Sequence, residues 1–291
     1  MICGSFAPYC AHMGDQTNYD KLLSIKGNLE IVLNTNAWNG RWFLRAINDM
    51  GEPIGSAESE ECRIDSLSQS FATISGLGNE KLAKDALNSA YSMLFDKKNG
   101  LIKLLDPPFS GLTDPGYIAD YPPGIRENGG QYTHGACWLI IAHFLAGEKE
   151  KALEMLFAIL PGNHTSSDKE VLRYRVEPYV VAADVYSSKF NEGMGGWTWY
   201  TGSASWLYQT LIKYMLGIDI AGNEVHLEPR VPDSWSQYDV SMKIAGAQVN
   251  MHFVKTEHSR RIICNGIEVG TDTLPVNWRR GDRIDVDIFY L

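Results

Sequence analysis

The segment from Gln131 to Ala146, QYTHGACWLIIAHFLA, is apolar around nearly the whole circumference of a helix, and Ser203–Leu216 has the same character. A helix of this kind is buried inside a larger assembly. Glu80–Asp96 and Glu148–Leu160 instead carry their leucines on one stripe with polar residues opposite, which is typical of surface helices. Buried helices alternating with amphipathic ones predict a mainly α fold of two helical layers. Concentric rings, as in an α/α toroid, fit this order better than a four-helix bundle does.

Beyond Gly217 the hydrophobic pattern changes from the period of a helix to that of a strand. Four segments alternate apolar and polar residues, as half-buried strands do: Val225–Leu227, Tyr238–Ile244, Val249–Phe253 and Ile284–Tyr290. Asn265-Gly266, between two apolar triplets, indicates a hairpin because both residues tolerate positive φ. The sequence therefore predicts two domains: residues 1–217, a helical domain, and residues 218–291, a small antiparallel β domain.

Length and composition describe a globular chain of one large or two ordinary domains. It has 291 residues, of which 44% are hydrophobic, and a formal net charge of -9. This apolar content is enough to bury a core, whereas an acidic chain without a basic run is poorly suited to nucleic acid. The longest apolar stretch, Ala136–Gly147, is interrupted by His143 and is too short to cross a bilayer. We expect no nucleic-acid partner and no membrane span.

Several common motifs are absent from the sequence. The N-terminal residues have no basic region followed by an apolar core, and the five cysteines are scattered without a CxxC pair. Both features favour a cytoplasmic protein with reduced thiols. The seven histidines show no HxxxH or HExxH spacing, and GxGxxG, Walker and GxSxG motifs are lacking. We expect no metal site, no cofactor and no dinucleotide, nucleoside-triphosphate or serine-hydrolase chemistry.

The densest polar cluster, residues 121–134, runs directly into the first apolar helix. It contains Arg126, Glu127 and His134. Unpaired N–H groups and a partial positive charge at a helix N-terminus attract anions, so this cluster predicts an anion site. The alternative is structural: Glu127 and Asn128 cap the helix, and His134 is an interior histidine.

A second cluster, GGWTWYTGSASW from Gly195 to Trp206, opens the other apolar helix. Trp197 and Trp199 offer flat faces on which sugars stack, and Thr201-Gly202-Ser203 offers hydroxyl and backbone donors. The alternative is an aromatic core with Thr201 or Ser203 as an N-cap. Together the two clusters predict a polyhydroxylated ligand and an anion, but they do not identify a reaction.

Two acidic segments have simpler structural interpretations. Glu177-Pro178-Tyr179 is interpreted as the start of a helical stretch with proline at its first position. Glu58, Glu60 and Glu61 are interpreted as a solvated loop.

Six motifs follow one another along the chain: Trp38–Ala46, Gly51–Ser56, Glu61–Ser70, Tyr121–Trp138, Arg173–Ser187 and Gly195–Trp206. In this order they resemble glycoside hydrolase family 94, the cellobiose and chitobiose phosphorylase family. The variants ECRIDS and YRVEPYVVAADVYS are most similar to the C-terminal phosphorylase-type module of cyclic β-1,2-glucan synthases and to β-1,2-oligoglucan phosphorylases.

The resemblance implies an (α/α)6 barrel followed by a β domain. It also implies inverting phosphorolysis, in which inorganic phosphate attacks the anomeric carbon of a β-glucoside and a carboxylic acid protonates the leaving oxygen. The product would be α-glucose 1-phosphate, and phosphate would be a co-substrate rather than a cofactor. By motif, His134, Thr201 and Gly202 correspond to phosphate-binding positions. Substrate-binding positions correspond to Arg126, Glu127, Tyr132, Glu177 and Trp199.

The sequence departs from the family at the general acid. The family's acid is an aspartate in a Trp-Asn-Asp type motif, which nothing here matches, since Trp38-Asn39-Gly40 belongs to a different motif. We therefore expect no catalytic acid in this chain, which would be the C-terminal portion of a barrel plus the β domain, inactive alone. Exposed apolar helix faces would then associate with the missing N-terminal part or with a second copy.

Two other functions remain open at this point. One is a non-catalytic carbohydrate-binding or structural fragment with a vestigial site. The other is hydrolysis with Glu127 as the acid, for which the sequence offers no partner base.

Overall fold

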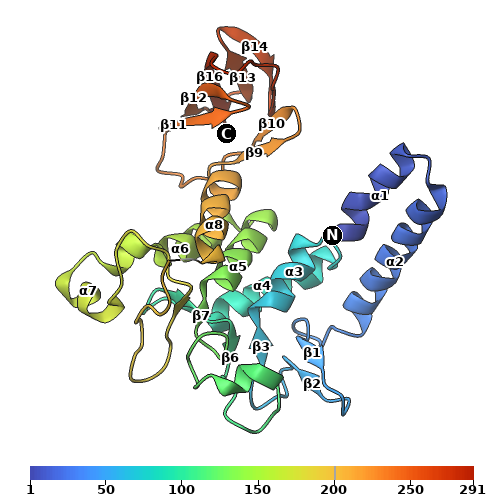
Figure 1. Cartoon of the computed structure of the whole chain (residues 1–291), viewed down its shortest axis with the longest axis vertical. Coiled ribbons are helices and arrows are strands. Elements are labelled where there is room, and N and C mark those ends of the chain that lie inside the picture. The colour runs from blue at the N-terminus through green and yellow to red at the C-terminus, as the bar shows by residue number, and fades with distance from the viewer. Residues whose placement is uncertain (200) are drawn as a thin grey trace. The chain divides into compact units, whose positions relative to one another are not determined.

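Two units make up the chain, Met1–Leu207 and Tyr208–Leu291, and the computed structural model describes all of their residues except Tyr200. Figure 1 shows that most helices belong to the first unit and the longer strands to the second. Within this described part, no helix is long and apolar enough to cross a membrane. The α-helices are α1 (Ile2–His12), α2 (Gln16–Thr35), α3 (Ser66–Ile74), α4 (Glu80–Leu94), α5 (Thr133–Leu145), α6 (Lys149–Ala158), α7 (Asp168–Tyr174) and α8 (Gly202–Gln209).

Helix α5 is the buried helix that the sequence predicts. Its Leu139, Ile140 and Ile141 side chains are at most 1% exposed, and it packs against α3, α4 and α6. The predicted surface helices are observed as α4 and α6, each with one buried face. The second predicted apolar helix is observed as α8, which continues into a π-helical segment, Thr210–Met215. The prediction that it is buried is wrong for most of α8, in which Ser203 and Leu207 are buried but Tyr208 is 58% exposed.

Short strand pairs and single 3-10 turns connect the helices of the first unit. The pairs are β1 (Ala46–Ile47) with β2 (Pro53–Ile54), β3 (Ile64–Asp65) with β6 (Leu105–Asp106), β4 (Phe95–Asp96) with β5 (Leu101–Ile102), and β7 (Gln131–Tyr132) with β8 (Asp184–Val185). The turns are η1 (Gly116–Asp120) and η2 (Pro161–His164).

Buried side-chain amides hold the irregular loops in place. Gln69 accepts a hydrogen bond from the Phe43 backbone N–H and donates one to the Phe43 carbonyl, both at 2.9 Å. Asn128 does the same for Phe109, at 2.7 and 2.9 Å. Each amide therefore bonds to the backbone as a neighbouring strand would. In this way the buried N–H and C=O groups of Phe43 and Phe109 have hydrogen-bond partners.

The solvated-loop interpretation is wrong for Glu61. Its side chain is 4% exposed and accepts hydrogen bonds from the backbone N–H and the hydroxyl of Ser110, at 2.7 and 2.6 Å. The backbone N–H of Thr113 donates another at 3.0 Å. These donors offset the desolvation of the carboxylate. Glu61 thus anchors the loop that follows Phe109, while Glu58 and Glu60 are exposed as expected.

Two sheets make up the second unit. One contains β9 (Ile218–Ala221), β10 (Glu224–Leu227) and β15 (Thr273–Pro275), in the order β15-β10-β9. The other contains β11 (Gln237–Ile244), β12 (Ala247–Lys255), β13 (Arg261–Cys264), β14 (Ile267–Gly270) and β16 (Arg283–Tyr290), in the order β11-β12-β16-β13-β14. The Asn265-Gly266 hairpin joins β13 to β14, as the sequence predicts.

The prediction of a purely antiparallel β domain is wrong for one strand pair, because β12 and β16 are parallel. A parallel pair needs a long crossover connection, which residues 256–282 supply by forming β13, β14 and β15. Strands β12 and β16 then bury a common apolar face, on which Val249 aligns with Ile284 and Phe253 with Ile288. Alternation predicts which face of a strand is buried, but it does not specify the direction of its neighbour.

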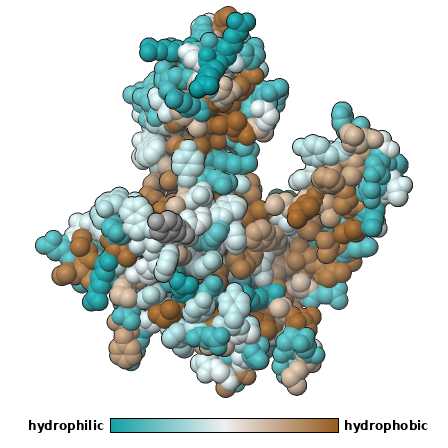
Figure 2. All heavy atoms as spheres, viewed as in Figure 1, coloured by the Kyte–Doolittle hydropathy of each residue, from teal (hydrophilic) through white to brown (hydrophobic). Residues whose placement is uncertain are grey.

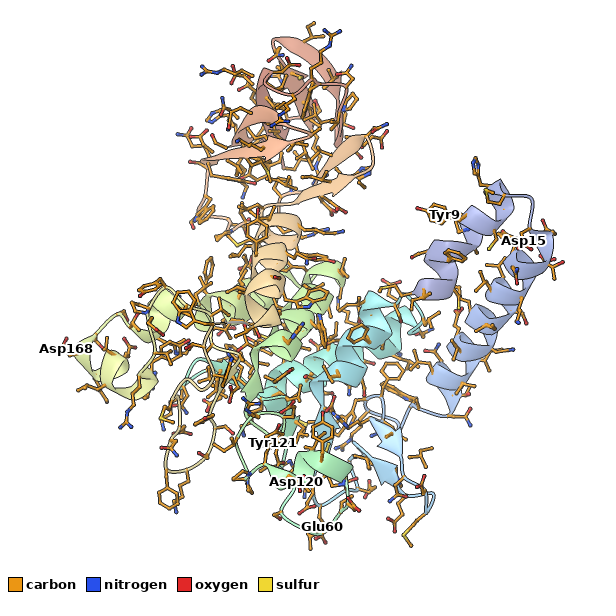
Figure 3. The ribbon with its side chains drawn as sticks, viewed as in Figure 1. Tyr9, Asp15, Glu60, Asp120, Tyr121 and Asp168 are labelled. Carbon is orange, nitrogen blue, oxygen red and sulfur yellow. The ribbon has the colours of Figure 1, made fainter. Side chains whose placement is uncertain are left out.

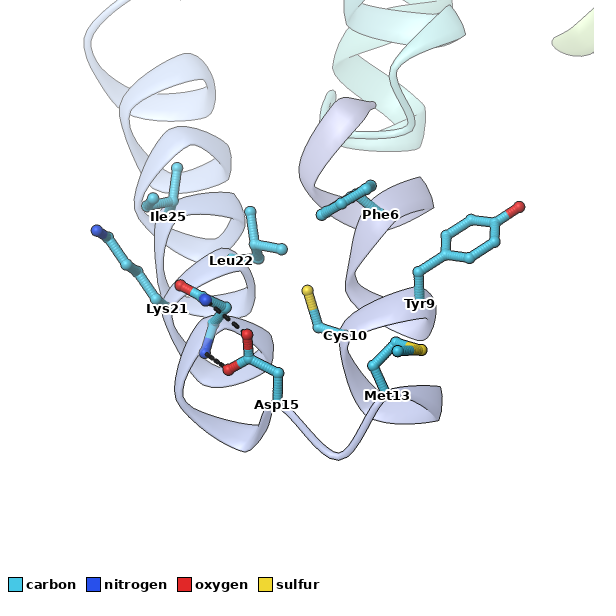
Figure 4. Close-up of a pocket in the computed structure, with 9 residues that line it drawn as sticks. Phe6, Tyr9, Cys10, Met13, Asp15, Lys21, Leu22 and Ile25 are labelled. Atoms are coloured by element: carbon cyan, nitrogen blue, oxygen red, sulfur yellow. Dashed lines mark hydrogen bonds between the residues drawn. The ribbon is translucent and has the colours of Figure 1, made fainter.

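Helices α1 and α2 form a hairpin whose apolar side chains are largely exposed. Asp15 caps α2 by accepting a hydrogen bond from Asn18 N at 3.1 Å, as Figure 4 shows. No residue of α2 is buried. Even its large apolar side chains are exposed, Leu29 to 50%, Ile31 to 62% and Val32 to 52%. Figure 2 shows apolar side chains gathered over this hairpin.

We expect the chain to associate through this exposed surface, because contiguous apolar patches drive association. Replacing Leu29 and Val32 together with glutamate should lower the associated fraction without loss of stability, since both side chains are exposed. Sedimentation velocity over a concentration series measures this effect. Asn28→Glu, at an exposed polar position of the same helix, is the control for added charge. A wild-type chain that stays monomeric throughout the series would contradict the prediction.

Two buried histidines make the free energy of unfolding depend on pH. Burial lowers the pKa of His143 and that of His164 to about 4, compared with about 6.5 in an unfolded chain. The unfolded state binds more protons between these values, so stability should fall as the pH drops from about 6.5 to 4, by about 2–3 kcal/mol for each histidine. Urea unfolding at neutral pH and at about pH 4.5 measures the loss. His143→Gln should reduce it, whereas the exposed-site control His258→Gln should not.

Candidate functional site

Three segments that are distant in sequence meet around β8. Tyr132 of β7 pairs with Asp184 of β8. The Ala183 backbone N–H donates to the Trp197 carbonyl at 2.7 Å, and Gly196 N–H donates to the Asp184 carbonyl at 2.8 Å. The backbone therefore brings the loop before α5, the segment around Asp184 and the glycine-tryptophan cluster into one place.

A cavity of about 370 Å³ lies where these segments meet. Its wall combines polar residues with the aromatic rings of Tyr132 and Trp197. The lining residues are Arg126, Tyr132, His134, Ala183, Asp184, Trp197, Thr201, Gly202 and Ser203.

The N-termini of α5 and α8 both contribute to the wall. Helix α5 begins at Thr133, so His134 lies in its first turn, and α8 begins at Gly202. A Cβ atom at Gly202 would lie 3.0 Å from His134 Cε1, which shows how closely the two helix starts approach. The first N–H groups of a helix have no partner within it and favour negative charge. Two such ends at one cavity suit an oxyanion.

The imidazole of His134 lies among three aromatic rings. Ring centroids are 4.9 Å from Trp138, 5.8 Å from Trp206 and 6.1 Å from Tyr132. Burial lowers the pKa of His134 below its usual range. The imidazole is therefore neutral near pH 7, and it offers one N–H donor rather than a full charge.

Arg126 supplies the cationic side chain of the cavity. It lies on the loop after η1, and Figure 3 marks the start of that loop with Tyr121. The guanidinium carbon is 5.7 Å from the centroid of the Tyr121 ring. The backbone of Arg126 has φ 47°, a left-handed conformation that costs about 1–2 kcal/mol for a residue with a side chain. A strained backbone conformation persists only where the surrounding structure holds it in place, and such conformations are frequent at functional sites.

Asp184 is the buried acidic residue of the wall. Burial raises the pKa of its carboxyl above the usual range, although the N–H of Trp197 and the charge of Arg126 oppose the rise. Two side-chain oxygens of the wall, Asp184 Oδ2 and Thr201 Oγ1, are buried and have no hydrogen-bond partner among the residues that the structure describes. Leaving such atoms without a partner costs about 1–3 kcal/mol each. They indicate a polar ligand.

Comparison with known proteins places the chain in a family. Residues 1–217 match the catalytic domain of the Glycosyl hydrolase 94 superfamily. The chain belongs to this superfamily. The resemblance drawn from the six motifs is therefore confirmed.

The relatives include a glucan synthase and several phosphorylases. The chain is 41% identical to a cyclic beta-(1,2)-glucan synthase of Rhizobium meliloti over 75% of its own length and 8% of that protein. It is 28% identical to the solabiose phosphorylase of Paenibacillus borealis over 88% of its length, and 24% identical to the N,N'-diacetylchitobiose phosphorylase of Vibrio furnissii over 97%. The match spans 34% of each of these two phosphorylases.

The family 94 site positions named from the sequence fall into two groups in the structure. Arg126, Tyr132, His134, Thr201 and Gly202 line the cavity together. Glu127 lies next to Arg126 in the chain, and its charge acts on the carboxyl of Asp184, but it is not part of the lining.

Glu177 and Trp199 form the second group, outside the cavity. Trp199 Nε1 donates to Glu177 Oε1 at 3.1 Å, and Trp197 Nε1 donates to the Trp199 carbonyl at 3.1 Å. Trp197 and Trp199 are 57% and 54% exposed, so they form an open aromatic surface that begins at the cavity wall. The predicted helical start at Glu177 is wrong, because residues 177–180 form a turn. Proline at the first position is compatible with a turn as well as with a helix.

The capping alternatives do not match the observed contacts. Asn128 is fully buried and bonds to the backbone of Phe109 and Tyr121 rather than to α5. Thr201 directly precedes α8, but its hydroxyl makes no capping bond with any residue that the structure describes.

Asp184 is the site residue that sequence reasoning missed. It lies within the motif Arg173–Ser187. The available signal was a single carboxylate in the otherwise apolar run from Tyr179 to Val185, because buried acids are rare unless they are paired or functional.

A second cavity, of about 500 Å³, lies between α1 and α2. Figure 4 shows Phe6, Leu22 and Ile25 around it, with Asp15 already engaged as the α2 cap. It lacks the convergence of helix N-termini, arginine and histidine that marks the first cavity.

Proposed function

We propose that this chain forms the phosphate-binding and sugar-binding part of an inverting glycoside phosphorylase that acts on β-glucans. The observation that carries the proposal is the cavity in which Arg126, His134 and the N-termini of α5 and α8 converge. An oxyanion held there would receive backbone N–H bonds, one imidazole N–H bond and the charge of the guanidinium. The open surface of Trp197 and Trp199 would stack on sugar rings.

In the proposed reaction, one oxygen of phosphate attacks the anomeric carbon while the bond to the glycosidic oxygen breaks. The leaving oxygen takes a proton from a carboxylic acid, and α-glucose 1-phosphate forms with inversion. The residues of this chain bind the phosphate and orient its attacking oxygen, which lowers the entropic cost of the encounter. Proton transfer from the acid contributes about 10²–10⁴-fold in rate, and we assign that acid to no residue of this chain.

The identity to a cyclic beta-(1,2)-glucan synthase supports a β-1,2-linked substrate. The match to a catalytic domain over residues 1–217 supports helices that form part of an (α/α)6 toroid. Because the chain spans only about a third of the phosphorylases it matches, we propose that the rest of the barrel, or a second copy, completes the active site.

Two measurements test this function. Calorimetry should detect binding of inorganic phosphate and of β-1,2-gluco-oligosaccharides. His134→Asn should weaken phosphate binding, whereas His258→Asn, at an exposed histidine of the second unit, should not.

The chain alone should release no glucose 1-phosphate, because we assign the acid to no residue of this chain. Robust phosphate-dependent turnover would show that an acid is present after all. No heat with either ligand would favour a structural fragment with a vestigial site.

Hydrolysis is a second candidate because the structure places another carboxylate, Asp184, within electrostatic reach of Glu127. An inverting hydrolase uses two carboxyl groups, one as the general acid and one as the general base. Sugar release without phosphate that disappears in Glu127→Gln would support hydrolysis and count against phosphorolysis.

A further inference from the structure

Asp184 is an unexpected residue for an anion site. Among the described lining residues it is the acidic one, in a wall otherwise made of donors, aromatic rings and the Arg126 guanidinium. A carboxylate beside a bound oxyanion is repulsive unless a proton lies between the two groups.

The structure constrains this carboxylate closely. Asp184 is 1% exposed, and its Oδ1 accepts the Trp197 backbone N–H at 3.1 Å. A Cβ atom at Gly196 would lie 2.5 Å from Oδ2 and 2.6 Å from Oδ1, so the glycine backbone packs directly on the carboxylate. One oxygen is therefore held by the protein. The other, Oδ2, has no partner within the described part of the chain.

The unsatisfied oxygen selects for a ligand that donates a hydrogen bond. Burial raises the pKa of Asp184, but the Trp197 N–H and the charge of Arg126 favour the ionised form, and an ionised carboxylate can only accept hydrogen bonds. The dianion of inorganic phosphate carries one hydroxyl near neutral pH and can donate to it. Sulfate has the same shape and charge but carries no proton, so it would place a bare oxygen against the carboxylate.

We propose that Asp184 determines the anion specificity of this cavity, favouring phosphate over sulfate by accepting the hydrogen bond of the phosphate hydroxyl. This inference rests on the proposed function, in that the cavity has to bind phosphate. Specificity here comes from an unfavourable contact with the wrong ligand as much as from a favourable contact with the right one.

Competing tetrahedral anions test the proposal. Calorimetry on the full chain near pH 7.5 would compare phosphate and arsenate, whose dianions carry a hydroxyl, with sulfate and selenate, which carry none. The wild-type chain should bind the first pair at least about 10-fold more tightly, as expected for one hydrogen bond between charged groups. In Asp184→Asn, the new N–H donor meets the bare oxygen of sulfate. Sulfate affinity should rise and phosphate affinity should fall. The ratio of phosphate affinity to sulfate affinity should therefore fall to about one or below.

Asp168→Asn is the matched control, because it makes the same change at an exposed aspartate at the start of α7. It should keep the wild-type ratio. Equal wild-type affinity for phosphate and sulfate would overturn the inference, as would unchanged selectivity in Asp184→Asn. Either result would leave phosphate binding, and therefore the proposed function, intact. A wild-type chain that binds none of the four anions would remove the proposed function and this inference together. If Asp184→Asn does not fold, the wild-type comparison of the four anions still decides between these outcomes.

Discussion

Replacing Gly196 with alanine is expected to weaken phosphate binding by at least about 10-fold while leaving the fold intact. The new methyl group would lie 2.5 Å from Asp184 Oδ2, so the carboxylate has to move. It is the flexible end of a side chain, and we therefore expect a stability cost at the low end of the range for overpacking, about 1 kcal/mol. The displaced carboxylate would lose its Trp197 N–H bond and enter the space proposed for phosphate. Calorimetry with phosphate, together with thermal unfolding, separates the two effects.

Gly162→Ala is the control for this substitution, because a Cβ atom at Gly162 meets nothing within 4 Å. It should bind phosphate as the wild type does. If Gly196→Ala keeps full affinity, the carboxylate does not lie next to the bound anion, and the proposed arrangement of the cavity is wrong.

Replacing Gly217 with alanine is expected to destabilise the second unit by about 2–5 kcal/mol, the largest stability effect that we anticipate. Gly217 has φ 71°, and an added Cβ would overlap the carbonyl group of Glu228. The Glu228 backbone N–H donates to the Gly217 carbonyl at 2.8 Å and holds the two residues together. The left-handed conformation costs about 1–2 kcal/mol, and the backbone overlap adds about 1–3 kcal/mol. Urea unfolding, monitored by hydrogen exchange in the β strands, measures the loss in the free energy of unfolding.

Gly222→Ala isolates the contribution of the overlap. Gly222 has φ 60° and open space at its Cβ position, so it carries the conformational cost alone. It should lose about 1–2 kcal/mol. Equal losses at Gly217 and Gly222 would show that the Glu228 carbonyl moves aside freely.

Most helices could be predicted from the sequence because their burial is periodic. Leu82, Ala86 and Ala90 recur at helical spacing, and α4 is found within a few residues of the expected range. The exact start of α5 could not be predicted, because Gln131 and Tyr132 are drawn into β7 by a partner more than fifty residues away. Local spacing carries no information about such a partner.

The candidate site was predictable where residue type and position along the chain were sufficient. A histidine and an arginine next to the start of an apolar helix indicated an anion site, and the structure brings Arg126, His134 and Gly202 to one cavity. Glu177 and Trp199 lie instead on the exposed surface beyond it, because a turn follows α7 where a helix was expected.

The sequence by itself determined the helical first unit, the change to strands after Gly217, the membership of family 94 and the two clusters that form the cavity. These depend on local periodicity and on long motifs, which are properties of neighbouring residues. Only the tertiary structure decided that Glu61 is buried, that β12 and β16 are parallel and that Asp184 lies in the wall of the cavity with one carboxylate oxygen free of partners among the described residues. Each of these depends on which distant backbone groups reach a side chain or strand, and burial and hydrogen bonding are set by those distant partners rather than by the residues next to them in the chain.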